Sequence, residues 1–117
     1  DFNAPAANLE AMLAHVADNA DFYRVMLGKD GAGAFVSRLR DYLRRVAAES
    51  CQTISEDSVQ HTMPPYLILN FIASAYIGVI VWWVEHDCPG SPAEVAAHLL
   101  ILTMQGPYRA FGLVPPG

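Results

Sequence analysis

The densest group of potential metal ligands in the sequence is Glu85, His86, Asp87 and Cys88, four consecutive residues that follow a long apolar segment. Consecutive residues at the end of a helix point in different directions, so neighbours of this kind rarely bind one ion together. His98 is a conceivable further ligand on the next helix. The simpler interpretation is that His86 interacts with the negative end of a helix dipole. We therefore expect no metal site.

No sequence motif points to catalysis. Gly28, Gly31 and Gly33 follow no predicted strand and match no phosphate-binding fingerprint. Cys51 and Cys88 lie 37 positions apart, with no C-x-x-C motif, and we expect free thiols or small buried hydrophobic residues. Because no nucleophile–base pair and no metal constellation can be found, we expect no catalytic residues, no cofactor and no enzymatic activity.

Aromatic side chains are more suggestive, because they recur along most of the chain. Tyr and Trp need a polar partner when they are buried. A small helical domain rich in Tyr, Trp and Met can enclose an apolar cavity with a few polar groups. The alternative interpretation is that these side chains only fill the core. The aromatic residues in question are Phe22, Tyr23, Phe35, Tyr42, Tyr66, Phe71, Tyr76, Trp82 and Trp83.

The charge of the chain argues against direct binding of nucleic acid. The 117 residues include 12 acidic and 7 basic side chains, which give a formal net charge of −5. A nucleic-acid module needs a basic excess instead. A local basic cluster, Arg38, Arg40, Arg44 and Arg45, is interrupted by acidic residues. We interpret this cluster, and the polar side of the first helix at His15, as solvated faces.

Composition and periodicity predict a folded, all-α domain. Hydrophobic residues make up 53% of the chain and charged residues 16%, which is the opposite of the balance in a disordered segment. The length fits one domain with its own core. Apolar residues at helical spacing predict about five helices and no strand. The expected helices span residues 8–18, 21–27, 32–50, 64–86 and 92–105, with a frayed tail over 107–117. We expect residues 51–63 to form a loop, with a helical turn inside it as the alternative.

Local signals give the expected helix boundaries. Ser91, Pro92 and Glu94 form a capping box, with Ser as the N-cap, Pro as the first helical residue and Glu as the third. Asn8 is a good N-cap for the first helix. The turn at Cys88–Gly90 is short, so we expect the last two helices to form an antiparallel hairpin.

The run Tyr66–Val84 contains 19 residues without a charge. Its length would allow it to span a membrane, and Trp82 and Trp83 resemble an interfacial belt. Against a membrane span, Asn70 and Ser74 lie inside the run, and its flank is acidic, without a positive-inside signal. An apolar helix can instead be buried on every side in a soluble dimer, between its own protomer and the partner. We favour the dimer.

Small residues on this run support the same interpretation. Ser74 and Gly78 share a stripe at helical spacing with Phe71 and Trp82. Small side chains let two helix backbones approach closely. Packing within one chain is the alternative explanation for the stripe.

Four segments are informative when they are taken in order. They are HVADNADFYRVMLG (His15–Gly28), Phe35 with Leu39–Tyr42, FIASAYIGVIVWWVEH (Phe71–His86) and SPAEVAAHLL (Ser91–Leu100). Together they resemble the C-terminal regulatory domain of TetR-family bacterial transcription regulators. The likeness covers roughly Leu9–Gly106 and is most specific where G-x-x-x-W-W precedes a capped helix.

This resemblance implies a function. In that family an N-terminal helix-turn-helix domain binds operator DNA, and the C-terminal domain binds a small-molecule inducer and forms the homodimer through its last two long helices. The helix-turn-helix has no counterpart here and the chain begins at Asp1, so we expect a piece of a longer gene product. We expect a cytoplasmic homodimeric repressor with an unidentified small-molecule effector, no membrane contact, and operator DNA bound only through the missing N-terminal domain.

The resemblance also implies where the sites lie. Residues 1–117 would form one regulatory domain, with ligand-side helices in 8–50, a loop in 51–63, dimerisation helices in 64–106 and a tail in 107–117. The dimerisation helices would build a four-helix interface with those of the partner. The predicted ligand-binding residues are Phe22, Met26, Phe35, Leu39, Tyr42, Tyr76 and Trp83. The predicted dimer-interface residues are Phe71, Ser74, Gly78, Trp82, Val95, Leu99 and Leu102.

Two other functions stay open. One is a helical interaction module whose groove binds another protein and no small ligand. The other, which we favour less, is a single-span membrane protein.

Overall fold

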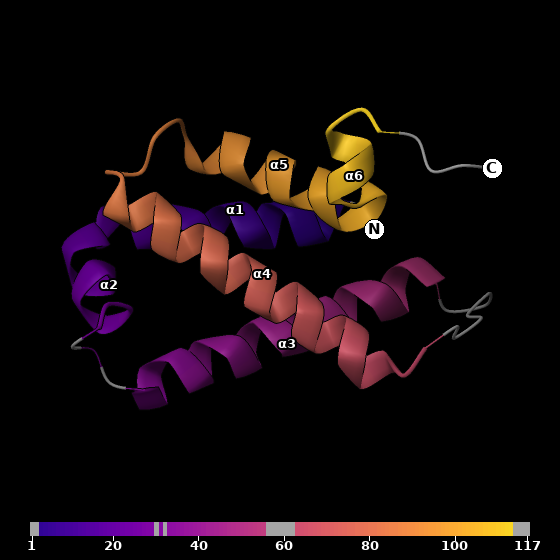
Figure 1. Cartoon of the computed structure of the whole chain (residues 1–117), viewed down its shortest axis with the longest axis horizontal. Helices are drawn as coiled ribbons and strands as arrows, with labels where there is room; N and C mark the ends of the chain where they lie inside the picture. The colour runs from indigo at the N-terminus through magenta and orange to yellow at the C-terminus, as the bar shows by residue number, and fades with distance from the viewer. Residues whose placement is uncertain (1–2, 30, 32, 56–62, 114–117) are drawn as a thin grey trace.

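The structure of the chain, a computed structural model, describes residues 3–29, 31, 33–55 and 63–113. Over these residues the secondary structure is helical, with turns and no strand, which confirms the predicted all-α class (Figure 1). The helices are α1 (Asn3–Asp18), α2 (Ala20–Met26), α3 (Gly33–Ser55), α4 (Pro65–Glu85), α5 (Pro92–Gln105) and α6 (Pro107–Ala110).

Helix α1 begins at Asn3, so Asn8 lies inside the helix, and its prediction as the N-cap is wrong. The apolar pattern starts only at Leu9, which is buried. The residues before it include three alanines, which favour a helix strongly but add little to an apolar stripe. Pro5 is compatible with the first turn, where its missing N–H is not needed.

Helix α3 continues to Ser55, beyond its predicted end at Ser50. The segment from Cys51 to Ser55 is therefore a continuation of α3. Its prediction as loop is wrong, and the alternative of a helical turn is closer to the structure. These residues contain neither Gly nor Pro, so nothing in the local sequence ends the helix. The remainder of the predicted loop, 56–62, lies outside the described residues.

The chain beyond α5 is also more regular than predicted. Gly106 has a φ of 86°, which lets the chain turn sharply between α5 and α6. The Leu113 N–H then donates a hydrogen bond of 2.9 Å to the Tyr108 carbonyl. The predicted frayed tail is thus a helical turn over Pro107–Ala110, and residues 114–117 lie outside the described part of the chain.

The helices pack mainly as two pairs. Helix α1 lies along α5, helix α3 packs against α4 and crosses it at an angle, and α2 covers one end against α4 (Figure 1). Both pairs contribute to one core, in which α4 has the largest share. The buried hydrophobic residues are Leu9, Leu13, Val16, Leu27, Leu43, Ala73, Ile77, Ile80, Trp83, Val84, Ala96 and Leu99.

A tight turn connects α4 to α5. The Trp83 indole N–H donates to the Pro89 carbonyl at 2.9 Å, which fastens the turn to the core. Arg24 Nε donates to the Val84 carbonyl at 2.9 Å and so satisfies a carbonyl at the end of α4. Helix α5 then runs back across the molecule, diverging from α4 (Figure 1).

The predicted N-cap of α5 at Ser91 is confirmed. The Ser91 hydroxyl oxygen accepts a hydrogen bond of 3.1 Å from the Glu94 N–H. The same hydroxyl donates to Glu94 Oε1 at 3.3 Å. Pro92 is the first helical residue, as predicted.

Helix α4 is long and apolar enough to cross a membrane by length and composition, which is weak evidence by itself. Only 28% of its most apolar 18-residue window is buried within the chain. Its exposed side carries large apolar residues, namely Tyr66, Leu67, Phe71 and Trp82. Within the described residues of the protomer, this apolar face has no cover.

Candidate functional site

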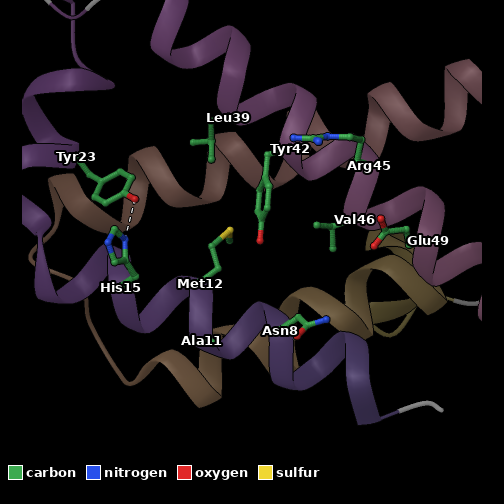
Figure 2. A pocket seen from close by; sticks show the side chains of 10 residues that line it. All are labelled: Asn8, Ala11, Met12, His15, Tyr23, Leu39, Tyr42, Arg45, Val46 and Glu49. Atoms are coloured by element: carbon green, nitrogen blue, oxygen red, sulfur yellow. Dashed lines mark hydrogen bonds between the residues drawn. The ribbon is translucent and has the colours of Figure 1, made fainter.

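A cavity of about 700 Å³ lies between α1 and α3, with Tyr23 of α2 at one end (Figure 2). We call it the slot. Pockets for small organic ligands typically measure about 300–1,000 Å³, so the slot is large enough for one. Its lining residues are Asn8, Ala11, Met12, His15, Tyr23, Leu39, Tyr42, Arg45, Val46 and Glu49.

The middle of the slot is largely apolar on both walls. Figure 2 shows Leu39 and Tyr42 pointing from α3 toward α1, and Met12 pointing back from α1. The Tyr42 hydroxyl forms no hydrogen bond with any residue that the structure describes. The walls thus offer an apolar surface with one uncommitted hydroxyl near its centre, which is the usual composition of a ligand pocket.

A hydrogen-bonded pair closes one end of the slot. His15 Nδ1 lies 2.9 Å from the Tyr23 hydroxyl, and the two rings meet edge to face with centroids 5.7 Å apart. Burial raises the pKa of the Tyr23 phenol above its usual value. A phenol is protonated near neutral pH even at its ordinary pKa of 10.0, so the Tyr23 hydroxyl can donate to His15. The sequence prediction of a merely solvated His15 misses this role, although the side chain is exposed.

The opposite end of the slot carries polar and charged side chains, Asn8, Arg45 and Glu49 (Figure 2). Arg45 forms neither an ion pair nor a hydrogen bond with the described residues, whereas Glu49 has an interaction of its own. A guanidinium without a partner at the border of a cavity is available to an anionic group.

Two of the predicted ligand-binding residues, Leu39 and Tyr42, line the slot. Both come from the face of α3 that borders α1. Three further predicted residues lie on α2 and at the start of α3 without lining the slot: Phe22, Met26 and Phe35.

The two predicted ligand-binding residues on α4 lie away from the slot. The Tyr76 hydroxyl is 2.6 Å from Thr103 Oγ1 on α5. Trp83 is only 2% exposed and belongs to the core. The inner face of α4 packs into the core, so it does not form a wall of the slot.

The predicted dimer-interface residues on α4 all lie on its exposed side. Phe71 is 68% exposed and Trp82 is 53% exposed, and Ser74 and Gly78 between them are exposed as well. A Cβ atom added at Gly78 would meet no heavy atom within 4 Å. These four residues therefore form a continuous open stripe, which we call the α4 stripe.

The predicted interface residues on α5 are placed differently from one another. Leu102 is exposed, next to Ile101 and Met104, which are also exposed. Val95 is half-buried against the core. Leu99 is 2% exposed and is already packed inside its own protomer, so its surface is not open to a partner.

The acidic and sulfur-containing residues after α4 form a turn. His86 stacks on Trp82 with ring centroids 4.3 Å apart, and Asp87 lies 3.5 Å from Arg24. Burial raises the pKa of the Cys88 thiol, and the nearby Arg24 charge partly opposes this. The described residues contain no group of three or more His, Cys, Asp or Glu side chains that could hold a metal ion.

Sequence reasoning missed most of the slot because periodicity identifies the stripe of each helix that faces the core. The slot walls lie beside that stripe, where polar and apolar residues mix. A second regular spacing was nevertheless present in the sequence. On each of the two helices, this spacing places four residues on the flank that lines the slot. They are Asn8, Ala11, Met12 and His15 on α1, and Leu39, Tyr42, Val46 and Glu49 on α3.

Comparison with known families agrees with this architecture. The TetR-type family model described as the transcriptional regulator C-terminal region matches residues 3–105. No curated protein and no solved structure gives a significant match. The matched region extends from the start of α1 to the end of α5, so it includes both walls of the slot and the α4 stripe. The chain therefore belongs to the family of TetR-type transcriptional regulator C-terminal regions.

Proposed function

We propose that the chain is the effector-sensing and homodimerisation domain of a TetR-like transcriptional repressor of the bacterial cytoplasm. The observation that carries this proposal is the slot, a cavity of about 700 Å³ with mixed apolar and polar walls, in a chain of this regulator family. Operator DNA would be read by a separate N-terminal domain. The net charge of −5 agrees with that division of roles.

The exposed apolar surface of α4 supports the homodimer. Phe71 and Trp82 are large and more than half exposed. They lie on one face of the helix, and only the small residues Ser74 and Gly78 lie between them on that face. Contiguous apolar patches of this kind usually mark an interaction surface. A second copy would cover the stripe, and the exposed residues Ile101 and Leu102 of α5 would extend the interface.

The packing of the helices suggests how the slot and the dimer communicate. Helices α1 and α5 form one packed pair, and α3 and α4 form the other. The slot lies between α1 and α3, one from each pair, while the proposed interface uses α4 and α5, again one from each pair. A ligand that changes the spacing of the pairs would therefore change the splay of α4 and α5. Its differential affinity for the two dimer geometries would then weaken operator binding.

A thermal-shift screen with a slot-filling variant tests effector sensing. Compounds that bind the folded chain should raise its melting temperature by mass action. Ala11→Phe places a ring in the slot from an exposed position on α1 and should abolish these shifts. Ala34→Phe, an equally exposed change outside the slot, should leave them intact. Shifts that survive Ala11→Phe would remove the slot as the effector site.

One observation favours the alternative of a protein-interaction module. Helix α6 and the turn after it present Tyr108 and Phe111, which are 73% and 85% exposed. Such aromatic residues are enriched in protein interfaces. If no compound stabilises the chain and Phe111→Ser abolishes binding to a partner protein, the interaction module is the correct function.

A further inference from the structure

Basic residues are concentrated on one part of this acidic protein. Four of its seven Lys and Arg residues lie between positions 38 and 45 on α3. Three of them, Arg38, Arg44 and Arg45, line a second hollow of about 450 Å³ together with Asp41. We call it the basic hollow.

The charges in the basic hollow are only partly neutralised within the chain. Arg44 is committed, because it pairs with Asp41 at 2.7 Å and donates to Asn70 Oδ1 at 3.4 Å. Arg38 and Arg45 form no ion pair or hydrogen bond with other residues that the structure describes. Within the described part of the chain, two guanidinium groups of the hollow therefore remain available to an anion.

Arg45 lines both the slot and the basic hollow. Figure 2 shows that its side chain runs along α3 instead of crossing the slot as Tyr42 does. The apolar walls of the slot thus adjoin a guanidinium that faces the hollow. Each cavity also carries one carboxylate: Glu49 lines the slot, and Asp41 lines the hollow, where Arg44 pairs with it at 2.7 Å.

We propose that the effector is an anionic amphiphile, an organic molecule with an apolar body and a single anionic end. Its body would lie between Met12, Leu39 and Tyr42, and its anionic group would bind Arg45, with Arg38 adding positive charge. A guanidinium binds carboxylate, sulfonate and phosphate groups through paired hydrogen bonds. This assignment of the ligand class rests on the proposed role of the slot.

A matched pair of fluorescent probes tests the ligand class. 8-Anilinonaphthalene-1-sulfonate and N-phenyl-1-naphthylamine share the same rings and differ by the sulfonate. The 117-residue chain should bind the sulfonate at least about tenfold more tightly, since charge-assisted hydrogen bonds are the strong ones. A purely apolar cavity would prefer the neutral amine instead. Binding of the neutral amine that equals or exceeds that of the sulfonate would overturn the proposal.

Variants of Arg45 test whether this residue causes the preference for the sulfonate probe. Arg45→Gln should reduce sulfonate binding by about tenfold and leave binding of the neutral amine unchanged, while Arg45→Lys should retain part of the preference. Arg109→Gln on α6 removes the same charge away from both cavities and serves as the control. An equal loss in Arg109→Gln and Arg45→Gln would mean that only net charge matters, which contradicts the proposal. Circular dichroism of each variant verifies that the helices are intact.

Ala11→Phe separates failure of this proposal from failure of the proposed function. If the variant abolishes binding of both probes but the native chain shows no preference for the sulfonate, the slot stands and the anionic class is wrong. If neither probe responds to Ala11→Phe, the slot is not the ligand site and both proposals fall. Displacement of the sulfonate by 1-naphthoate or by 1-naphthyl phosphate then identifies which anionic group is preferred, and displacement by neither would also overturn the proposal.

Discussion

The Tyr76 hydroxyl on α4 donates a hydrogen bond of 2.6 Å to Thr103 Oγ1 on α5. The direction follows from Thr103, whose own hydroxyl hydrogen is donated to the Leu99 carbonyl at 2.7 Å. Because Tyr76 lies in the middle of α4 and Thr103 near the end of α5, this bond ties the diverging helices together away from the turn that connects them. It thereby links the two helices that carry the proposed dimer interface.

Removal of this bond should lower stability measurably. Tyr76→Phe deletes only the hydroxyl and should reduce the free energy of unfolding by at least about 1 kcal/mol, the usual net value of one hydrogen bond, since Tyr76 also has a further interaction. Tyr42→Phe is the matched control, because the Tyr42 hydroxyl has no partner among the described residues. Urea denaturation measures both variants. Equal effects of the two substitutions would contradict the role given to Tyr76.

Truncation of the two adjacent tryptophans should affect different properties, stability for Trp83 and self-association for Trp82. Trp83 is 2% exposed and its indole holds the Pro89 carbonyl, so Trp83→Ala should cost about 3–5 kcal/mol of stability. Trp82 is 53% exposed, so Trp82→Ala should change the stability of the monomer far less but weaken self-association. Denaturation gives the first quantity and analytical ultracentrifugation the second. Loss of association in neither variant would exclude Trp82 from an interface.

A substitution at Gly78 should weaken self-association without lowering the stability of the monomer. A Cβ atom added at this position meets no heavy atom within 4 Å, and replacing Gly in a helix interior by Ala gains roughly 0.5–1 kcal/mol. Gly78→Leu should therefore leave the monomer at least as stable while overpacking the contact with a partner and weakening the dimer. Gly33→Ala, at the other glycine on a described helix with open surroundings, should not change association. Unaltered dimerisation of Gly78→Leu would remove Gly78 from the interface.

The raised pKa of Tyr23 predicts a loss of stability at high pH. The phenol has its ordinary pKa of 10.0 when unfolded and a higher pKa when burial disfavours the phenolate. Above pH 10 the unfolded chain thus binds fewer protons than the folded chain, so the free energy of unfolding falls as pH rises. This contribution is fully present below pH 10 and is lost as pH rises through the folded pKa. Tyr23→Phe should flatten the decline in denaturation curves recorded between pH 9 and pH 11; an unchanged slope would show that burial of Tyr23 has no such effect.

Local sequence signals predicted the helices better than they predicted the cavity. The N-cap at Ser91 and the apolar run of α4 depend on neighbouring residues alone, and both were predicted from sequence. The slot depends on how two non-adjacent helices face each other, which no local pattern contains. Leu39 and Tyr42 were found because they are apolar or aromatic. His15 and Arg45 were missed because a polar residue on a helix is normally solvated, and only tertiary packing brings these two to a shared cavity.

The dimer prediction shows a related limit. The α4 stripe follows from small residues at helical spacing, and the structure leaves that stripe exposed. On α5, Val95, Leu99 and Leu102 also recur at helical spacing, but Leu99 faces the core of its own chain. In a helix that is apolar on most sides, periodicity cannot distinguish the face that packs within the protomer from the face that remains open.

Sedimentation equilibrium of the unmodified 117-residue chain at micromolar concentration tests the central claim most directly, because an effector can act through the splay of α4 and α5 only if these helices form a dimer. We expect a mass twice that of the monomer, with Trp82→Ala and Gly78→Leu shifting the equilibrium toward monomer. A chain that sediments only as a monomer throughout this range would rule out control through the α4 and α5 interface.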